Sequence, residues 1–168
     1  QTVYSKIKGS VAAPTAGLHF TTDLLERIKA KGATITSVLL NVGLGTFRPV
    51  QVEDTEDHVM HHEYYEITSE AADIITEAME EGRRIIAIGT TTVRVLESAY
   101  RKHSRISADS DWTDIFIKPG FDFKVVDCLV TNFHLPQSTL LMLISAMLDR
   151  EFVLKIYNEA VAKEYRFF

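Results

Sequence analysis

A polar segment at residues 131–139 separates two largely apolar stretches, and this arrangement constrains the fold more than any other feature of the sequence. Residues 125–130 before it predict a buried strand, and residues 140–148 after it predict a helix in the core. Ser138 and Thr139 supply the start signal for that helix. In α/β proteins a polar loop between a buried strand and a buried helix is a common position for chemistry. Residues 131–139 are therefore the first candidate for a functional site.

Strand and helix patterns alternate along the rest of the chain. Helices are predicted at residues 22–31, 69–82, 90–102 and 151–164. Thr21 or Thr22 caps the first of them and Ser69 the second, and Gly32 and Gly82 end them. Strands are predicted at residues 33–42, 64–67, 84–88, 115–117 and 123–126, with a polar loop at 104–111. This alternation indicates a single α/β domain over residues 1–168, with a mixed, largely parallel sheet or an open barrel covered by helices.

Composition sets further bounds. The 168 residues are 46% hydrophobic and 24% charged, as expected for one domain whose core needs no disulfide or metal. Cys128 is the only cysteine, which excludes an internal disulfide and fits a reducing cytoplasm. The longest apolar run, residues 140–148, is too short to cross a bilayer, so no membrane association is expected. The net charge of −5 disfavours general nucleic-acid binding, although a local basic patch is compatible with it.

Both ends of the sequence have the character of internal segments. Residues 1–8 alternate like a strand and lack an initiating methionine, and residues 165–168 include three aromatic side chains of a kind that is usually buried. We therefore expect the domain to be truncated at both ends and to be part of a longer protein.

The first candidate loop besides residues 131–139 is the segment Gly89-Thr90-Thr91, between a buried strand and a helix. A glycine followed by threonines at a helix start presents backbone N–H groups and hydroxyls, which suit a phosphate, a carboxylate or a ribose hydroxyl. The same residues are also common as simple helix caps. The motif alone leaves both interpretations open.

Two glycines, Gly43 and Gly45, lie in the loop that follows the strand predicted at residues 33–42. The loop lacks the third glycine and the following helix of a dinucleotide fingerprint, so it does not predict a Rossmann site. Close approach of the backbone to a ligand and an ordinary pair of turn glycines remain as alternatives.

Histidines supply the remaining candidates. His58, His61 and His62 lie beside Glu63, and this cluster fits a metal site, an acid–base site or a solvated loop. Its order and spacing differ from the helical His-Glu-x-x-His zinc signature. His19, which precedes the first predicted helix, suits either contact with a ligand or packing as a neutral, hydrogen-bonded residue.

Taken in order, the motifs resemble one family, the S-adenosylmethionine:tRNA ribosyltransferase-isomerases of queuosine biosynthesis. The resemblance runs from about residue 2 to the C-terminus. Its principal motifs are Pro14-Thr15-Ala16-Gly17-Leu18-His19-Phe20, Val42-Gly43-Leu44-Gly45-Thr46-Phe47-Arg48-Pro49-Val50, His58-Val59-Met60-His61, Gly89-Thr90-Thr91-Thr92-Val93-Arg94 and Thr131-Asn132-Phe133-His134-Leu135-Pro136. The chain departs from the family pattern at Asn41, where a histidine is expected, and at Cys128, where a glycine is usual.

The resemblance implies a reaction as well as a domain. It implies that this chain is the larger catalytic domain, without the family's second, β-rich domain. The implied enzyme moves the ribosyl part of S-adenosylmethionine onto a 7-aminomethyl-7-deazaguanine at the tRNA wobble position, forms epoxyqueuosine, and releases adenine and methionine. S-adenosylmethionine is then a co-substrate, no separate cofactor or metal is expected, and tRNA is the partner. The expected location is the cytoplasm, and a monomer is the default expectation.

The resemblance also implies which residues form the site. Proton transfer beside the sulfonium and at the departing adenine suits imidazoles with a pKa near neutrality. The predicted catalytic residues are His134, His19, His58 and His61. The predicted substrate-binding residues are Thr15, Gly17, Gly43, Gly45, Thr46, Arg48, Gly89, Thr90, Thr91, Arg94, Thr131 and Asn132.

Two other classes of function compete with this one. A non-catalytic domain that binds tRNA or a nucleotide would use the same scaffold. An S-adenosylmethionine methyltransferase is the second class, and the glycine pattern does not support it. Product analysis separates the three, because ribosyl transfer releases adenine and methionine, methylation releases S-adenosylhomocysteine, and a binder releases neither.

Overall fold

The computed structural model describes residues 2–10, 12–43 and 60–167. Its elements, in chain order, are the 3-10 helix η1 (Thr15–His19), α1 (Thr22–Ala30), β1 (Leu39–Asn41), β2 (Glu63–Ile67), α2 (Ser69–Glu80), β3 (Ile86–Ile88), α3 (Thr90–His103), β4 (Asp109–Thr113), β5 (Cys128–Val130), α4 (Thr139–Met147) and α5 (Arg150–Ala162). The mixed α/β class that the sequence predicts is confirmed.

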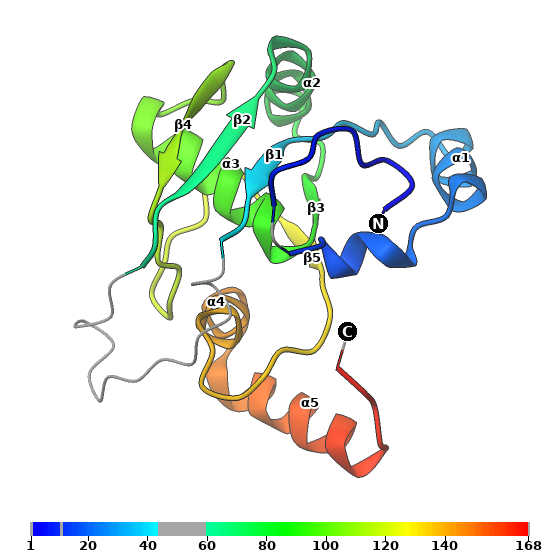
Figure 1. Ribbon diagram of the computed structural model, residues 1–168, viewed down its shortest axis with the longest axis vertical. Coiled ribbons are helices and arrows are strands. Elements are labelled where there is room, and N and C mark those ends of the chain that lie inside the picture. The colour runs from blue at the N-terminus through cyan, green and yellow to red at the C-terminus, as the bar shows by residue number, and fades with distance from the viewer. Residues whose placement is uncertain (1, 11, 44–59, 168) are drawn as a thin grey trace.

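The described strands form two small sheets (Figure 1). β2 is the central strand of an antiparallel sheet with the order β1-β2-β4, in which Tyr65 is opposite Leu40 on one side and Asp111 on the other. β3 and β5 form a parallel pair, with Ala87 opposite Leu129. Within the described ranges, parallel pairing is confined to that pair, and the larger sheet is antiparallel.

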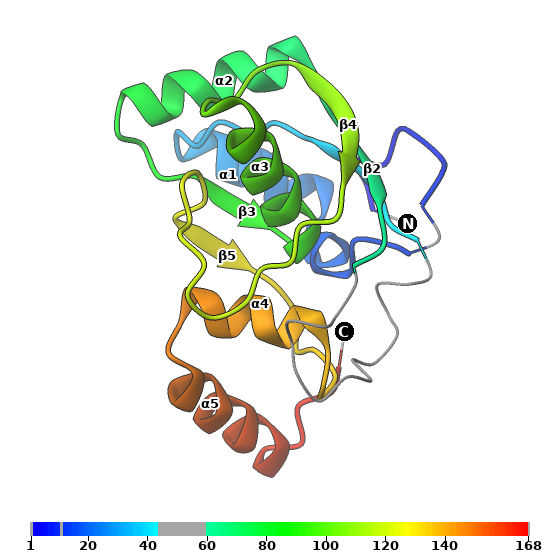
Figure 2. The ribbon, with the colours of Figure 1, turned by 90° about the vertical axis from the view of Figure 1, so that its left-hand side faces the viewer.

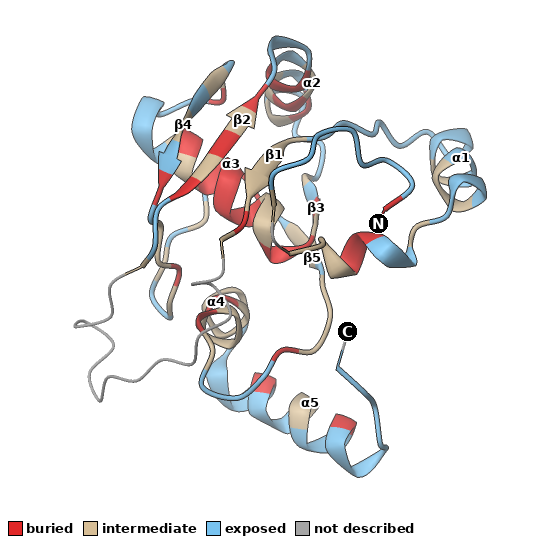
Figure 3. Ribbon diagram, viewed as in Figure 1, coloured by how far each residue is buried: buried red, intermediate tan, exposed pale blue. Residues whose placement is uncertain are grey.

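Helix α3 forms the centre of the core. It contacts β1, β3 and β4, and Figure 3 shows buried residues along its middle and an exposed C-terminal end. Val93, Val95, Leu96 and Ala99 are the apolar side chains that it buries. Each such valine or leucine contributes about 1.5–3 kcal/mol on full burial. The start of α3, next to β3, is therefore anchored in the apolar core.

Helix starts follow local sequence signals closely. The side chain of Thr21 accepts a hydrogen bond from the Leu24 N–H at 3.1 Å, and the side chain of Ser138 accepts one from the Leu141 N–H at 3.2 Å, so both predicted caps are confirmed. For α2 the cap is Thr68 instead of the predicted Ser69, because Thr68 is the residue with extended backbone whose hydroxyl reaches the Ala71 N–H at 3.2 Å.

Strand predictions were wrong at residues 115–117 and 123–126, which form no regular strand. The buried carboxylate of Glu97 accounts for the second segment. It accepts hydrogen bonds from the backbone N–H groups of Lys124, Val125 and Val126, each at 3.0 Å. These N–H groups are satisfied by a side chain and take no part in a strand ladder.

The reverse error occurs at β4, which begins inside the polar loop predicted at residues 104–111. Asp109 and Asp111 pair with Ile67 and Tyr65 of β2, and the Tyr65 hydroxyl donates a 2.6 Å hydrogen bond to the Asp109 carboxylate. Pairing with β2 thus gives this polar segment the conformation of a strand. The strand predicted at residues 33–42 is also shorter than expected, because only Leu39–Asn41 have a pairing partner in β2.

The last two helices form a separate layer (Figure 2). β5 lies between β3 and α4, and α5 packs on the far side of α4. Among the described helices, none is long and apolar enough to span a membrane. The loop from β5 to α4, which contains the polar segment of residues 131–138, therefore crosses from one layer to the other (Figure 1).

Candidate active site at the end of β5

The parallel pair β3–β5 brings two candidate loops to one edge. Ile88 and Val130 are opposite each other at the carboxyl ends of the two strands, and the Gly89 N–H donates a 2.8 Å hydrogen bond to the Val130 carbonyl. The segment Gly89-Thr90-Thr91 and the loop from Thr131 onward therefore start side by side. The carboxyl edge of parallel strands is where α/β proteins usually bind ligands.

Gly89 makes the turn from β3 into α3. Its φ is +90°, a left-handed conformation that suits glycine, and no side chain caps the helix at this position. Thr92 donates its hydroxyl to the Ile88 carbonyl at 2.9 Å, so this threonine is engaged with the strand end. Thr90 is buried and Thr91 half-buried at the helix start, where the dipole of α3 favours a negative charge. The predicted anion contact at Thr90 and Thr91 stays a prediction.

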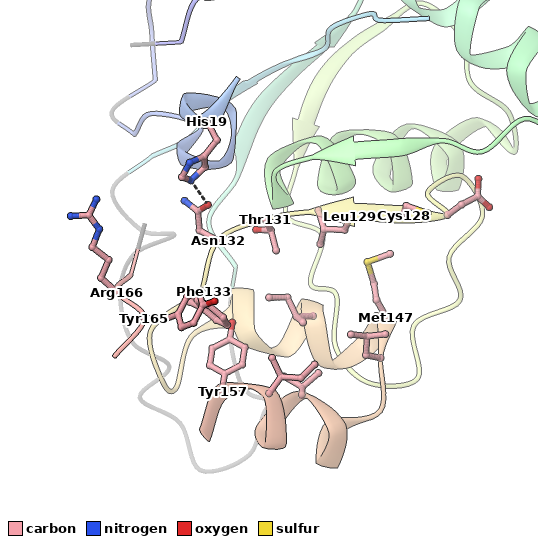
Figure 4. Close-up of a pocket in the computed structure, with 15 residues that line it drawn as sticks. His19, Cys128, Leu129, Thr131, Asn132, Phe133, Met147, Tyr157, Tyr165 and Arg166 are labelled. Carbon is pink, nitrogen blue, oxygen red and sulfur yellow. Dashed lines mark hydrogen bonds between the residues drawn. The ribbon is translucent and has the colours of Figure 1, made fainter. Parts of the chain in front are cut away.

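His19 lies at the same edge, although it is far from the other two loops in the sequence. Its Nε2 lies 3.0 Å from the Asn132 Oδ1, and the two residues are separated by 113 positions. The side chains point toward one another in Figure 4. η1, which ends at His19, also contains Ala16, and a Cβ added at Gly89 would lie 4.0 Å from the Ala16 Cβ. The N-terminal motif and the two strand-end loops thus form one region.

Thr15 and Gly17 lie in η1 itself. Gly17 is buried, and a Cβ added there would lie within 1.9 Å of the Tyr4 hydroxyl oxygen. The glycine at this position therefore leaves room for Tyr4. The structure gives Gly17 this packing role, and its predicted contact with substrate stays a prediction.

His134 lies deeper in the loop and is only 5% exposed. Its Nε2 is 3.1 Å from the Thr131 hydroxyl, and its backbone N–H donates a 3.1 Å hydrogen bond to the Tyr157 hydroxyl oxygen. Among the described residues its Nδ1 has no hydrogen-bond partner. Burial lowers the pKa of His134 to about 4, because desolvation disfavours the imidazolium form. His134 is therefore a neutral imidazole at pH 7.

A cavity of about 620 Å³ lies beside this loop, large enough for a nucleoside-sized ligand. Its polar wall includes His19, Thr131, Asn132 and Tyr157. Its apolar wall comes from β5, α4 and α5 and includes Leu129, Ile144, Met147 and Val153. His134 is not among the residues that line it and lies behind Thr131.

Aromatic rings form one end of the cavity (Figure 4). The Phe133 ring packs edge-to-face on Tyr157, with centroids 5.2 Å apart, and on Tyr165, with centroids 5.8 Å apart. Arg166 lines the cavity at the same end. Such rings can stack on a base or face a cation, and the guanidinium can contact a carboxylate or phosphate.

Arg94 of α3 and Glu63 of β2 form a buried ion pair. Their side chains are 4% and 1% exposed, and Arg94 Nη1 contacts Glu63 Oε2. The other oxygen of Glu63 accepts a 3.1 Å hydrogen bond from the Gly43 N–H. The Nε and Nη2 atoms of Arg94 have no hydrogen-bond partner among the described residues. The pair thus joins α3, β2 and the start of the glycine loop, while direct contact of Arg94 with substrate stays a prediction.

Among the remaining predicted residues, one does not line the cavity, and four lie outside the residues that the structure describes. His61 is exposed just before β2, and His58, Gly45, Thr46 and Arg48 lie outside the described residues. Within residues 2–10, 12–43 and 60–167, no three His, Cys, Asp or Glu side chains are placed so that they could hold a metal ion.

Tyr157 and the aromatic end of the cavity were not predicted from the sequence. Tyr157 follows Val153 by four positions and precedes Ala160 by three, and both of these are buried on α5. That helical spacing places the Tyr157 side chain on the inner face of the helix. Helical periodicity could therefore have identified it, whereas the approach of Tyr165 to Phe133 has no local signal.

The comparisons with known proteins agree in their outcome. A family model described as "Queuosine biosynthesis protein" matches residues 1–168. An S-adenosylmethionine:tRNA ribosyltransferase-isomerase from Staphylococcus epidermidis is 58% identical over 168 residues, which are 100% of this chain and 49% of that protein. Its counterpart from Staphylococcus saprophyticus is 56% identical over the same span. The chain thus spans about half the length of the curated relatives it matches.

A solved structure is also similar. The crystal structure of S-adenosylmethionine tRNA ribosyltransferase from Thermotoga maritima matches with a TM-score of 0.73 and 44% sequence identity. The match covers 91% of this chain and 48% of that one.

Proposed function

The chain belongs to the queuosine biosynthesis protein family, and we propose that it forms the catalytic part of an S-adenosylmethionine:tRNA ribosyltransferase-isomerase. The observation that carries the proposal is the meeting of His19 and Asn132 at the wall of a nucleoside-sized cavity. These residues come from two separate motifs that both belong to the family resemblance, and they enclose one site.

The proposed reaction uses S-adenosylmethionine as co-substrate and a tRNA with a 7-aminomethyl-7-deazaguanine wobble base as acceptor. A base removes a proton from the 5′-carbon beside the sulfonium, adenine leaves with a proton, and methionine leaves with the sulfur. The ribosyl carbons are joined to the aminomethyl nitrogen and rearranged to the epoxycyclopentane of epoxyqueuosine. The chemistry needs proton carriers and an environment suited to a cation, and no separate cofactor.

The described residues include candidate proton carriers and candidate contacts for a cation. His19 is exposed and lines the cavity, so its imidazole is accessible to a bound substrate and is our leading candidate for the base. His134 is buried and neutral, and it supports Thr131 from behind. We assign it hydrogen bonding within the loop and proton donation or acceptance through Thr131.

The aromatic end of the cavity is the proposed position of the sulfonium or of a base. The faces of Phe133, Tyr157 and Tyr165 provide ring surfaces, and ring faces attract cations at about 0.5–2 kcal/mol per contact. The Tyr157 hydroxyl already accepts a hydrogen bond from the His134 N–H, so its own proton is available for a ligand. Arg166 is the proposed contact for the methionine carboxylate or a tRNA phosphate.

We place the reaction in the cytoplasm, where both tRNA and a free thiol such as Cys128 occur. The test of the proposed function is product analysis with the full-length protein, S-adenosylmethionine and tRNA that contains the deazaguanine base. Adenine and methionine released in equal amounts support ribosyl transfer. S-adenosylhomocysteine would instead indicate methylation, and tRNA binding without any product would indicate a non-catalytic domain.

A further inference from the structure

The side-chain contact between Asn132 and His19 joins a ring nitrogen to an amide oxygen. His19 Nε2 lies 3.0 Å from the carbonyl oxygen of the Asn132 side chain, and among the described residues this is the one hydrogen bond of the His19 ring. A carbonyl oxygen only accepts hydrogen bonds, so with the Asn132 amide in this orientation the Nε2 atom of His19 carries the proton. A neutral imidazole has a single N–H, and its other nitrogen, Nδ1, then has a free lone pair.

We infer that Asn132 is a positioning residue that fixes the tautomer of His19, holding the proton on Nε2 so that Nδ1 is the nitrogen that accepts a proton from the substrate. The role of His19 in turnover rests on the proposed function, whereas the tautomer itself does not. Asn132 was predicted to bind substrate, and this inference gives its carbonyl oxygen a different partner.

The same contact suits both states of a proton carrier. When Nδ1 accepts a proton, Nε2 keeps its N–H, and the hydrogen bond to Asn132 becomes charge-assisted and stronger. The ring therefore keeps one orientation in its neutral and charged forms. An amide in the opposite orientation would donate to Nε2 and would lose that bond on protonation, because both ring nitrogens are then donors.

The loop holds Asn132 firmly enough for this task. Asn132 is two residues past the end of β5, between Thr131 and Phe133, whose side chains contact His134 and Tyr157 respectively. The Asn132 Nδ2 atom is buried and has no hydrogen-bond partner within the described ranges, so the amide is enclosed by protein on that side.

His134 provides an internal contrast. Its Nε2 faces the hydroxyl of Thr131, which can donate or accept, so that contact sets no tautomer. Of these two histidines in the family motifs, only His19 has a neighbour that dictates which nitrogen carries the proton. The ionisable groups that share the cavity wall with His19 are Asp127, Cys128, Tyr157, Tyr165 and Arg166.

The direct test is a two-bond proton–nitrogen NMR spectrum of the full-length protein with ¹⁵N-labelled histidine. The His19 signals are assigned by their loss in H19Q. We expect a pure Nε2–H pattern in the wild type and in N132D, whose carboxylate also only accepts, and averaged shifts from both tautomers in N132L. The control N158L, at an exposed position of α5, should leave the His19 pattern unchanged. An Nδ1–H pattern in the wild type, or the same pattern in N132L as in the wild type, would overturn the inference.

Kinetics separate positioning from substrate binding. We expect N132L to lower kcat by about 10–100-fold, the usual effect of losing a group that orients a functional side chain, with KM for S-adenosylmethionine within about twofold of the wild-type value. N132D should recover much of the lost kcat. A large rise in KM with unchanged kcat would make Asn132 a substrate contact and contradict the inference. If the wild type releases no adenine, the proposed function fails, and the NMR result still decides the tautomer.

Discussion

At the scale of single residues, burial gives the two loop histidines different chemistry. His134 is enclosed and has its pKa lowered to about 4, whereas His19 is exposed beside the cavity. Both stand in motifs that the sequence analysis marked as catalytic, and no local pattern separates them. The difference arises from which helices pack over each residue, because α5 supplies Tyr157 above the His134 backbone.

The lowered pKa of His134 predicts a pH effect on stability. The unfolded chain takes up a proton near pH 6.5, and folded His134 does so only near pH 4. The free energy of unfolding should therefore be unaffected by His134 above pH 6.5 and should fall by up to about 3 kcal/mol as the pH drops from 6.5 to 4. Thermal unfolding of wild type and H134Q at pH 7 and pH 4 measures it. Equal losses of stability in the two proteins would contradict the account.

We expect the buried ion pair of Arg94 and Glu63 to be much more sensitive to mutation than an exposed ion pair. E63Q leaves the Arg94 guanidinium buried without a counter-charge, so we expect a loss of about 3–5 kcal/mol in the free energy of unfolding. The matched control is E26Q, which breaks the exposed Lys29–Glu26 pair on α1 and should change stability by less than about 1 kcal/mol. Denaturant unfolding of both variants measures the difference, and similar costs would show that burial of the pair is unimportant.

At the scale of elements, the helices and the strands β2 and β3 were predictable, whereas β4 and the backbone at residues 123–126 were not. Caps and apolar spacing are local, so α1, α4 and α5 appear close to where the sequence places them. β4 depends on its pairing with β2, and the irregular backbone at residues 124–126 depends on a carboxylate at least 27 positions away. These distant partners leave no mark in the local pattern, which is why both segments were assigned wrongly.

Glu97 should therefore act as the anchor of that irregular segment. Its side chain is completely buried, and removing the carboxylate in E97A leaves three backbone N–H groups without an acceptor. We expect a loss of about 3 kcal/mol or more, since each unsatisfied buried group costs about 1–3 kcal/mol. Amide hydrogen exchange should show faster exchange at Lys124, Val125 and Val126. The control E77Q, at an exposed position of α2, should leave these amides protected.

At the scale of the whole molecule, the site is a product of topology. The parallel pair β3–β5 places the Gly89 and Thr131 loops at one edge, η1 brings His19 to that edge, and the α4–α5 layer closes the cavity (Figures 1 and 4). The sequence predicted most of the polar members, through motifs whose order resembles one family. It could not predict the aromatic end, because Tyr157 and Tyr165 meet Phe133 only after α5 has folded back.

The central claim is that ribosyl transfer takes place in the cavity beside His19. The most direct measurement is a crystal structure of the full-length protein with S-adenosylmethionine bound, prepared with H19Q to prevent turnover. The account predicts the nucleoside in this cavity, with the ribose 5′-carbon next to the side chain at position 19 and the sulfonium near the rings of Phe133, Tyr157 and Tyr165. S-adenosylmethionine bound elsewhere, with this cavity free of ligand, would contradict it.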